Sequence, residues 1–369
     1  MKIAIDCRSV FPGRGGIGRY AENLGKRMPE MESAEEYIIL TTERQKEKIC
    51  NGKNVVQWSF ACGMIDAFWE QMKLPGILEE NEIGLYHNPC FSLPIAREKT
   101  KLVTTIHDVV FRERPDLVEA RLREYLDRWT EVACKMADQI ITVSEYSKKQ
   151  VIKYYGVEDS KIEVIYNGIE NKFQKADKNE QERVKKLYGL KEFVLYMGAM
   201  EPKKNLDCLL DAMRIVKEKF PECQIVIAGG KGPQEYDIEK AIHVRGLENT
   251  AVVTGYVDEK DVTGLLSAAR VFVYPSVYEG FGFPPLEAMA CETPTIVSDA
   301  TSLPEIVGEG ACIVGKEDRE GMAKAIERLL SDKEEARAYS IKGKQRAGQF
   351  TWEKCIKKTW KLYNKVISG

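Results

Sequence analysis

The chain has 369 residues, of which 30% are charged and 44% are hydrophobic, and its formal net charge is −2. This balance argues against a protein that binds nucleic acid through bulk positive charge. The length exceeds the roughly 250–300 residues at which a single hydrophobic core stops growing, so two domains are expected. The three histidines and ten cysteines form neither an H-E-x-x-H nor a C-x-x-C motif, so we expect no catalytic zinc site.

Scattered cysteines are typical of a reduced cytosolic protein in which the thiols are small core residues. We recognise no signal peptide before the first predicted strand, and no apolar run reaches the ~18 residues that a membrane-spanning helix needs. The sequence therefore predicts a cytoplasmic protein. Peripheral contact with the inner face of a membrane stays open.

A glycine-rich loop follows the first predicted strand, residues 2–5, and leads into a helix. Gly13, Gly15 and Gly18 match the dinucleotide fingerprint G-x-G-x-x-G letter by letter. That fingerprint needs its first glycine at the turn that closes the strand, and here about half a dozen residues intervene. An anion site that includes Gly15 and Gly16, a structural loop and a dinucleotide site all remain open readings of this loop.

Strands and helices continue to alternate through the first half. Further strands are expected near residues 37–41, 54–58, 84–87, 102–106, 139–143 and 162–166, with helices across 66–78 and 115–136. His87 and His107 fall at the carboxyl ends of two of these strands, where ligands of open α/β sheets collect. His107 is the stronger functional candidate, with Asp108 expected to fix its tautomer.

The helix expected across 115–136 carries three arginines, Arg121, Arg123 and Arg128, interleaved with acidic residues. A solvated helix face is the favoured interpretation, over a surface for an anionic lipid acceptor.

The second half opens with a strand at 193–197, followed by a turn that contains Lys203 and Lys204 and leads into a helix. Two lysines at a strand-to-helix turn, with the helix dipole behind them, are typical of a phosphate site. A solvated lysine pair is the alternative.

An apolar run at 271–274 predicts a buried parallel strand, and a turn with two glycines follows it. Gly280 and Gly282 let the backbone approach a ligand closely. Two prolines then suit the first turn of a helix. We expect the amides of Leu286 and Glu287 to point at an anion, where the helix dipole also favours negative charge.

Glu279 and Glu287 frame this turn with seven residues between them. Together with the Gly-Phe-Gly-Phe turn and the Leu-Glu-Ala-Met-Ala helix start, they closely resemble the E-x7-E signature of the retaining glycosyltransferases of family 4. The resemblance extends over essentially the whole chain and is most specific in 193–205 and 271–305. It implies the GT-B fold, an α/β architecture of two doubly wound Rossmann-like domains that face each other across a cleft.

This resemblance implies an acceptor-binding domain at 1–172, a domain for the nucleotide sugar at 173–350, and a terminal helix at 351–369 that crosses back to the first domain.

It also implies roles for individual residues. Lys204 takes the position of the family lysine that binds the donor diphosphate, and Lys203 stands in for an arginine that some members place where this chain has Ala199 and Met200. Glu287 is expected to contact the ribose of the nucleotide. The catalytic residues implied are His107, Lys204 and Glu279. The remaining donor contacts implied are Gly280, Phe281, Gly282 and Phe283, with Tyr256 and Val257 beside the base.

The activity implied is retaining, metal-independent transfer of a hexosyl group to a glycan or lipid-linked glycan. Details of the turns resemble bacterial mannosyltransferases of polysaccharide synthesis, so GDP-mannose is the expected donor and no further cofactor is expected. UDP-N-acetylglucosamine and UDP-glucose are alternative donors. A nicotinamide-dependent enzyme, a non-catalytic sugar-nucleotide binder and a GT-B epimerase are alternative classes. The sequence predicts neither the linkage nor the oligomeric state.

Overall fold

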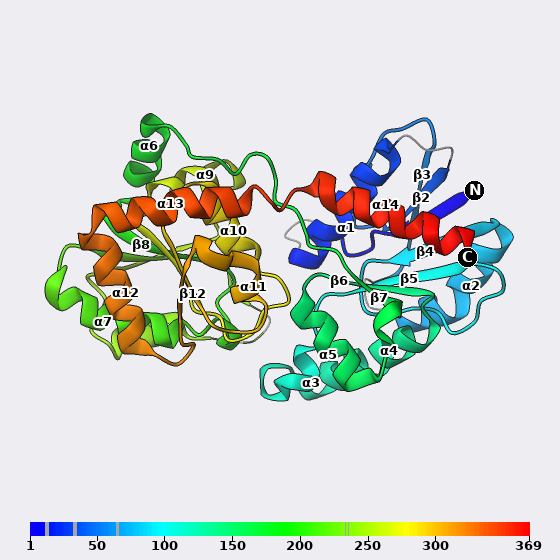
Figure 1. Cartoon of the computed structure of the whole chain (residues 1–369), viewed down its shortest axis with the longest axis horizontal. Coiled ribbons are helices and arrows are strands. Elements are labelled where there is room, and N and C mark those ends of the chain that lie inside the picture. Colours follow the sequence, from blue (N-terminus) through cyan, green and yellow to red (C-terminus); the bar gives the residue numbers. More distant parts are fainter. Residues whose placement is uncertain (12–14, 32–34, 64–65, 233, 235) are drawn as a thin grey trace. The chain divides into compact units, whose positions relative to one another are not determined.

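The computed structural model describes residues 1–369 except 12–14, 32–34, 64–65, 233 and 235. The chain divides into two compact units, one of residues 1–168 together with 352–369 and one of residues 169–351. The sequence analysis places these boundaries at 172 and 350. Each unit is built on one parallel sheet flanked by helices, which confirms the predicted pair of Rossmann-like α/β folds (Figure 1).

In its described residues, the first unit contains a seven-stranded sheet with strand order β3-β2-β1-β4-β5-β6-β7. The order reverses between β1 and β4. Loops that follow these two strands therefore diverge, and this is the place at the carboxyl edge where open α/β sheets bind ligands. The strands are β1 (Lys2–Asp6), β2 (Glu36–Thr42), β3 (Val55–Phe60), β4 (Ile83–Asn88), β5 (Lys101–Ile106), β6 (Gln139–Thr142) and β7 (Ile162–Val164).

Helices of the first unit follow the expected alternation with one shifted boundary. Helix α4 begins at Ala120 rather than at 115, because the Glu119 carboxylate accepts hydrogen bonds from the two following free amides, those of Arg121 and Leu122. The helices are α1 (Gly16–Arg27), α2 (Leu74–Glu80), α3 (Val110–Glu113), α4 (Ala120–Met136), α5 (Glu145–Tyr155) and α14 (Trp352–Ser368).

A π-helical segment, η2 (Trp69–Lys73), precedes α2 where the sequence predicts regular helix. Pro75 offers a physical reason, since a proline ring clashes with the carbonyl four residues earlier and a wider turn relieves that clash. Such segments are rare and occur often at functional sites. This one packs Trp69 against Arg8, whose guanidinium carbon lies 4.4 Å from the ring centroid.

The second unit has, in its described residues, a six-stranded parallel sheet with order β10-β9-β8-β11-β12-β13. Its order reverses between β8 and β11, so the loops after these two strands diverge as they do in the first unit. The strands are β8 (Phe193–Met197), β9 (Gln224–Ala228), β10 (Ala251–Gly255), β11 (Val271–Tyr274), β12 (Thr295–Ser298) and β13 (Cys312–Val314). The helices are α6 (Lys178–Tyr188), α7 (Leu206–Lys219), α8 (Ile238–His243), α9 (Glu259–Ala268), α10 (Phe283–Ala290), α11 (Leu303–Val307), α12 (Arg319–Ser331) and α13 (Lys333–Ala347).

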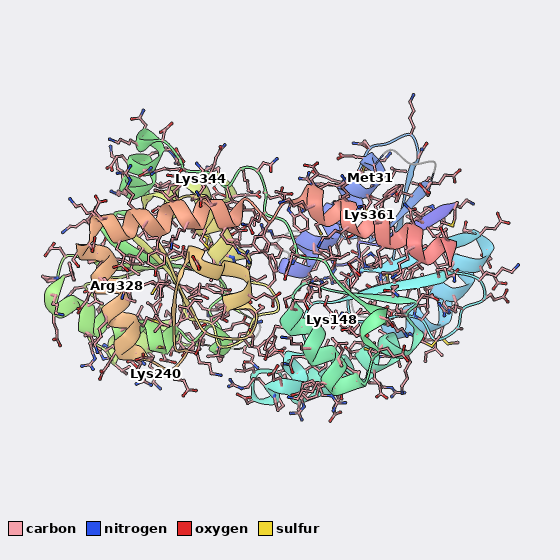
Figure 2. The ribbon with its side chains drawn as sticks, viewed as in Figure 1. Met31, Lys148, Lys240, Arg328, Lys344 and Lys361 are labelled. Atoms are coloured by element: carbon pink, nitrogen blue, oxygen red, sulfur yellow. The ribbon has the colours of Figure 1, made fainter. Side chains whose placement is uncertain are left out.

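The terminal helix α14 belongs to the first unit, and aromatic side chains anchor it there. Trp352 is 2% exposed and Tyr363 is fully buried, whereas Trp360 is half-buried. On the long helices, charged side chains project from the face that points away from the core. Lys344 on α13 and Lys361 on α14 are examples (Figure 2). The burial pattern of these two helices is thus amphipathic, with one face in the core.

Candidate active site

Two loops of the second unit bring Lys204 to Glu279. Lys204 ends the 3₁₀ turn η5 (Pro202–Lys204) after β8, and Glu279 lies in the loop after β11. The Lys204 Nζ lies 2.5 Å from Glu279 Oε1 and donates to the Tyr274 hydroxyl at 2.9 Å. Because β8 and β11 flank the reversal of strand order, this pair lies at the expected ligand-binding edge of the sheet.

Both members of this pair are ionised. Burial by itself lowers the pKa of Lys204, but the adjacent Glu279 carboxylate outweighs burial and leaves that pKa raised. Burial conversely raises the pKa of Glu279, and the charges of Lys204 and Lys203 outweigh it, so that pKa is lowered. The site therefore contains a buried ion pair, and removal of one partner alone would strongly destabilise the folded protein.

Four hydroxyl groups fix the position of Glu279, one of them that of Tyr274, which donates to Glu279 Oε1 at 3.0 Å. The Ser276 Oγ donates to Glu279 Oε1 at 2.7 Å. The Thr301 Oγ1 accepts from the Glu279 amide at 2.9 Å and donates to the Glu279 carbonyl at 2.8 Å, and Ser302 Oγ donates to the same carbonyl at 2.8 Å. Side chain and backbone of Glu279 are thus held independently.

Buried backbone amides lie directly after Glu279. Gly280, Phe281 and Gly282 are buried, and we find no hydrogen bond from their N–H groups to any described residue. Successive backbone N–H groups that make no bond to a described residue form a ready anion site. Gly282 has φ 96°, a left-handed conformation that favours glycine.

The amide prediction for Leu286 and Glu287 is wrong in detail. The helix α10 begins at Phe283 with its two prolines in the first turn, as predicted. In a helix that begins there, the Leu286 and Glu287 amides bond to the carbonyls of Gly282 and Phe283. The amides available to an anion are therefore those before the helix. Glu287 itself is 5% exposed and lies in the body of α10.

The other predicted donor contacts occupy different environments. Lys203 is one-third exposed, and its Nζ lies 3.3 Å from Glu201 Oε1. Tyr256 and Val257 follow β10 directly, with Tyr256 76% exposed and Val257 buried. Among these residues, Lys203 adds a second cation to the turn that carries Lys204, while no contact joins Tyr256 to the ion pair.

His107 lies at the carboxyl end of β5 in the first unit. Its Nε2 is 3.0 Å from the Pro89 carbonyl, and only a protonated nitrogen can donate to a carbonyl. Pro89 therefore fixes the tautomer, which corrects the role expected of Asp108, whose Oδ1 instead accepts from the Val110 amide. Burial lowers the pKa of His107, so the neutral ring has Nδ1 as an acceptor.

His87 has a structural role. Its Nδ1 lies 2.6 Å from the Tyr363 hydroxyl of α14, and its Nε2 lies 2.9 Å from Thr105 Oγ1. Burial lowers the pKa of His87 to about 3, so the ring is neutral and both nitrogens are occupied.

In the glycine-rich loop, Gly15 caps α1 and Gly16 opens it, both exposed, while Gly13 lies outside the described residues. β1 ends at Asp6, so the strand and α1 are not joined by the tight turn that the dinucleotide fingerprint requires.

Sequence reasoning missed the hydroxyl groups of Ser276, Thr301 and Ser302, and the phenol of Tyr274. Hydroxyl residues are common near turns, and nothing in their spacing shows that the loop after β12 returns to Glu279. One signal is Thr301 itself, a β-branched residue two positions before the first residue of the short helix α11.

Comparison with known proteins follows from this geometry. Residues 14–173 match the family model described as Glycosyltransferase Family 4, and residues 177–346 match that of Glycosyl transferases group 1. The chain is 28% identical to the O-antigen chain mannosyltransferase B of Escherichia coli, over 98% of this chain and 99% of the relative. It is 29% identical to an MMP alpha-(1->4)-mannosyltransferase of Mycolicibacterium hassiacum, over 77% and 71% of the two chains.

The fold agrees with these relatives. A sucrose-phosphate synthase from Thermosynechococcus elongatus superposes with a TM-score of 0.80 at 21% identity, covering 100% of this chain and 99% of that one. The chain belongs to glycosyltransferase family 4 and is a glycosyltransferase with the GT-B fold, as the resemblance in its motifs predicts.

The described part of the chain holds no helix that is both long and apolar enough to cross a bilayer. Nor do its described His, Cys, Asp and Glu side chains gather in threes as a metal ion would require.

Proposed function

We propose that this glycosyltransferase is a retaining mannosyltransferase that uses GDP-mannose and elongates a glycan or a lipid-linked glycan. The observation that carries the proposal is the buried Lys204–Glu279 pair beside the unpaired amides of residues 280–282. The choice of mannose is supported by the names of the two relatives, both mannosyltransferases.

The donor diphosphate is assigned to Lys204, Lys203 and these amides. An ammonium group has three N–H donors, and Lys204 directs two of them at Glu279 and Tyr274, so one remains for a phosphate oxygen. Glu201 and Glu279 balance the two lysines in formal charge. The dipoles of the amides and of α10 therefore supply the excess positive potential that an anionic leaving group needs.

The donor sugar is assigned to Glu279. Lys204, Tyr274 and Ser276 all donate to Glu279 Oε1, and no bond from a described residue reaches Oε2, which is available to a sugar hydroxyl. A catalytic role for His107, whose Nδ1 is an acceptor, is proposed on the family resemblance alone. The ribose is assigned to Glu287.

Retention is assigned to attack on the same face of the sugar, with the leaving phosphate accepting the proton of the acceptor hydroxyl. Glu279 is not the nucleophile in this scheme. An oxygen that accepts three hydrogen bonds, on a carboxylate whose pKa is lowered, has little of the basicity that covalent catalysis requires. We propose that no metal and no further cofactor is required, since the amide N–H groups, the α10 dipole and the remaining N–H of Lys204 are assigned to the diphosphate.

A lipid-linked acceptor would place the enzyme at the inner face of a membrane. The alternative to a solvated α4 face is that its exposed Arg121 and Arg128 make this contact. Flotation with anionic vesicles separates the two: recovery of the wild type but not of an Arg121→Gln, Arg128→Gln double variant would support the contact, and equal recovery would support the solvated face.

The first test is calorimetric titration with GDP, UDP, ADP and NAD in EDTA. Preferential binding of GDP is expected, and it would support donor choice and metal independence together. Preference for UDP would overturn the donor, and binding of NAD alone would overturn the assignment of the second unit. Incubation with GDP-mannose and mannobiose, followed by NMR of the anomeric protons, then tests retention, for which an α-linked product is expected.

A further inference from the structure

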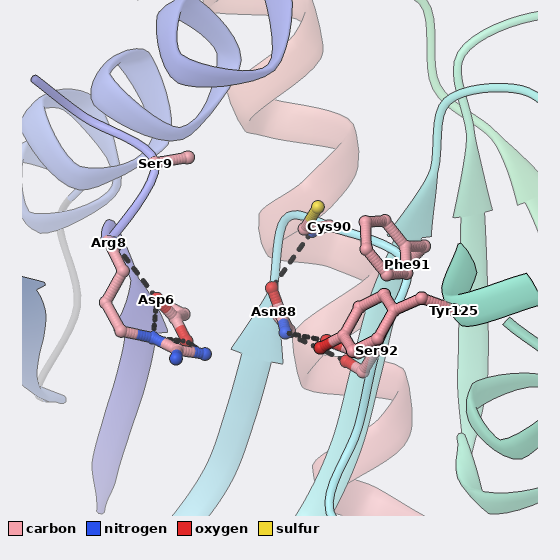
Figure 3. Close-up of a pocket in the computed structure, with 8 residues that line it drawn as sticks. All are labelled: Asp6, Arg8, Ser9, Asn88, Cys90, Phe91, Ser92 and Tyr125. Atoms are coloured by element: carbon pink, nitrogen blue, oxygen red, sulfur yellow. Dashed lines mark hydrogen bonds and ion pairs between the residues drawn. The ribbon is translucent and has the colours of Figure 1, made fainter. Parts of the chain in front are cut away.

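A narrow pocket opens in the first unit at the carboxyl ends of β1 and β4, the strands between which the order of the sheet reverses (Figure 3). None of the residues assigned above to the donor lines it. Its lining residues are Asp6, Arg8, Ser9, Asn88, Cys90, Phe91, Ser92 and Tyr125. The reversal of strand order is where a doubly wound sheet binds ligands, so this position is informative before any side chain is considered.

Arg8 is the unusual member of this lining. It is 2% exposed, and its Nη2 lies 2.7 Å from Asp6 Oδ2 and 3.1 Å from Glu70 Oε2. Its Nη1 is buried and has no hydrogen-bond partner. An unsatisfied buried donor is destabilising, the more so on a charged group, so this atom calls for a partner that binds there.

Glu70 has the complementary deficit. Its Oε2 accepts from Ser92 Oγ at 3.0 Å as well as from Arg8, but its buried Oε1 has no partner. Glu70 lies in the π-helical segment η2. In the buried Arg8–Glu70 ion pair, the donor Nη1 of Arg8 and the acceptor Oε1 of Glu70 therefore both lack partners.

The charge of the cluster selects the class of ligand. Arg8 faces two carboxylates, those of Asp6 and Glu70, so the three groups together are formally −1. Burial raises the pKa of Glu70, yet even a protonated Glu70 would leave the cluster neutral rather than positive. A phosphate or carboxylate is therefore disfavoured, and an uncharged group that both accepts and donates, a hydroxyl, fits.

The size and walls of the pocket narrow the class further. About 10 Å³ is enclosed, enough for one oxygen atom of a hydroxyl or a water. Ser9 lies on one side of the opening, and Phe91 and Tyr125 lie on the other (Figure 3). The two aromatic rings meet edge to face at 6.3 Å, and no bond from the Tyr125 hydroxyl to a described residue is found. Hydroxyl groups beside aromatic surface match a sugar ring, which has polar edges and apolar C–H faces.

We propose that this pocket is a subsite for an uncharged sugar residue of the acceptor, one hydroxyl of which enters the pocket and accepts from Arg8 Nη1. Ser9 and Tyr125 bond further hydroxyls of the same residue at the opening. The proposal rests on the proposed function, in that a glycan is the acceptor, and adds which residues bind it and that the bound residue carries no charge.

The test is NMR saturation-transfer titration with mannobiose, compared with mannose 6-phosphate and glucuronic acid. Replacing Arg8 by alanine would leave Asp6 and Glu70 buried without a counter-charge and endangers folding. The variants are therefore Tyr125→Phe and Ser9→Ala, each of which removes one hydroxyl. Each lost hydrogen bond should weaken mannobiose binding about tenfold. Tyr154→Phe, on the α5 surface of the same unit, is the matched control and should bind as the wild type does.

A crystal structure with mannobiose should place a sugar oxygen within hydrogen-bond distance of Arg8 Nη1. Wild-type affinity in both variants, tighter binding of either anionic sugar, or a lone water at Nη1 with the saccharide elsewhere would each overturn the subsite. Calorimetry with GDP on the same samples distinguishes failure of the sugar subsite from failure of the proposed function. Loss of nucleotide binding by the wild type would concern the second unit and leaves the result of the saccharide titration valid.

Discussion

The Thr301 hydroxyl bonds both backbone polar groups of Glu279. It accepts from the Glu279 N–H at 2.9 Å and donates to the Glu279 carbonyl at 2.8 Å. Thr301 does this with φ 50°, a left-handed conformation that is rare for a β-branched residue. Such strain costs on the order of 1–3 kcal/mol and persists only where the surroundings impose it. Thr301 is thus a positioning residue for Glu279, remote in sequence but in direct contact.

Replacing Thr301 by valine should lower turnover, because the shape of the side chain stays while both hydrogen bonds are lost. We expect kcat to fall about tenfold or more, with KM for the donor changed less, since the diphosphate ligands remain in place. Thr301→Ser keeps the hydroxyl and should restore most of kcat. Steady-state kinetics on both variants decide the matter. An equal loss of kcat in the valine and serine variants would show that the Thr301 hydroxyl does not position Glu279.

Variants of the Lys204–Glu279 pair should distinguish its contribution to stability from its contribution to catalysis. Lys204→Met leaves a buried carboxylate without its counter-charge and should destabilise the protein by roughly 3–5 kcal/mol while abolishing turnover. The double variant with Glu279→Gln removes both charges. It should regain much of the stability and none of the turnover.

Chemical denaturation and donor-turnover assays on the two single variants and the double variant complete this cycle. Recovery of turnover in the double variant would contradict a role for Lys204 on the leaving group.

Gly282 should not tolerate a side chain. A Cβ at this position would lie 2.7 Å from Leu303 Cδ2, on a backbone with φ 96°. Gly282→Ala should therefore weaken nucleotide binding by shifting the amides of the turn, beyond the ~1 kcal/mol that a left-handed alanine costs. Gly189→Ala is the matched control, since it shares a positive φ but meets no atom within 4 Å. Similar nucleotide affinity in both variants, by calorimetry, would remove the close-approach argument.

Stability should fall in acid because of His87. Burial lowers its pKa to about 3 from the usual 6.5, so between these values the unfolded chain binds a proton that the folded one does not. Stability from this source is complete above pH 6.5 and is lost as the pH falls. We expect a loss of about 2 kcal/mol between pH 7.5 and 5. The lowered pKa of His107 acts in the same direction.

Denaturant titrations at several pH values measure this slope. His87→Gln should show a shallower dependence than the wild type, whatever its absolute stability. An unchanged slope would mean that His87 does not bind a proton on unfolding.

Much of the fold follows from local pattern. The strands at 193–197 and 271–274 are read directly from short apolar runs, because strands covered on both faces by helices have no polar alternation. The π-helical segment at Trp69–Lys73, the strand β13 and the start of α4 are among the features that were not predicted. The first and the last depend on one residue each, Pro75 and Glu119, and β13 depends on pairing with β12. Hydrophobic periodicity in the sequence shows neither.

The candidate site divides in the same way. By itself the sequence determined the two sheets, the lysine turn and the acid–glycine turn that identify the family, because these are contiguous segments whose spacing reflects backbone geometry. Only the tertiary structure decided that Lys204 pairs with Glu279, that Pro89 fixes the His107 tautomer, that Thr301 holds the Glu279 backbone, and that one nitrogen of Arg8, which lines a pocket, is buried without a partner. These are contacts between residues far apart along the chain, and they exist only once parallel strands have brought their carboxyl ends to one edge of a sheet.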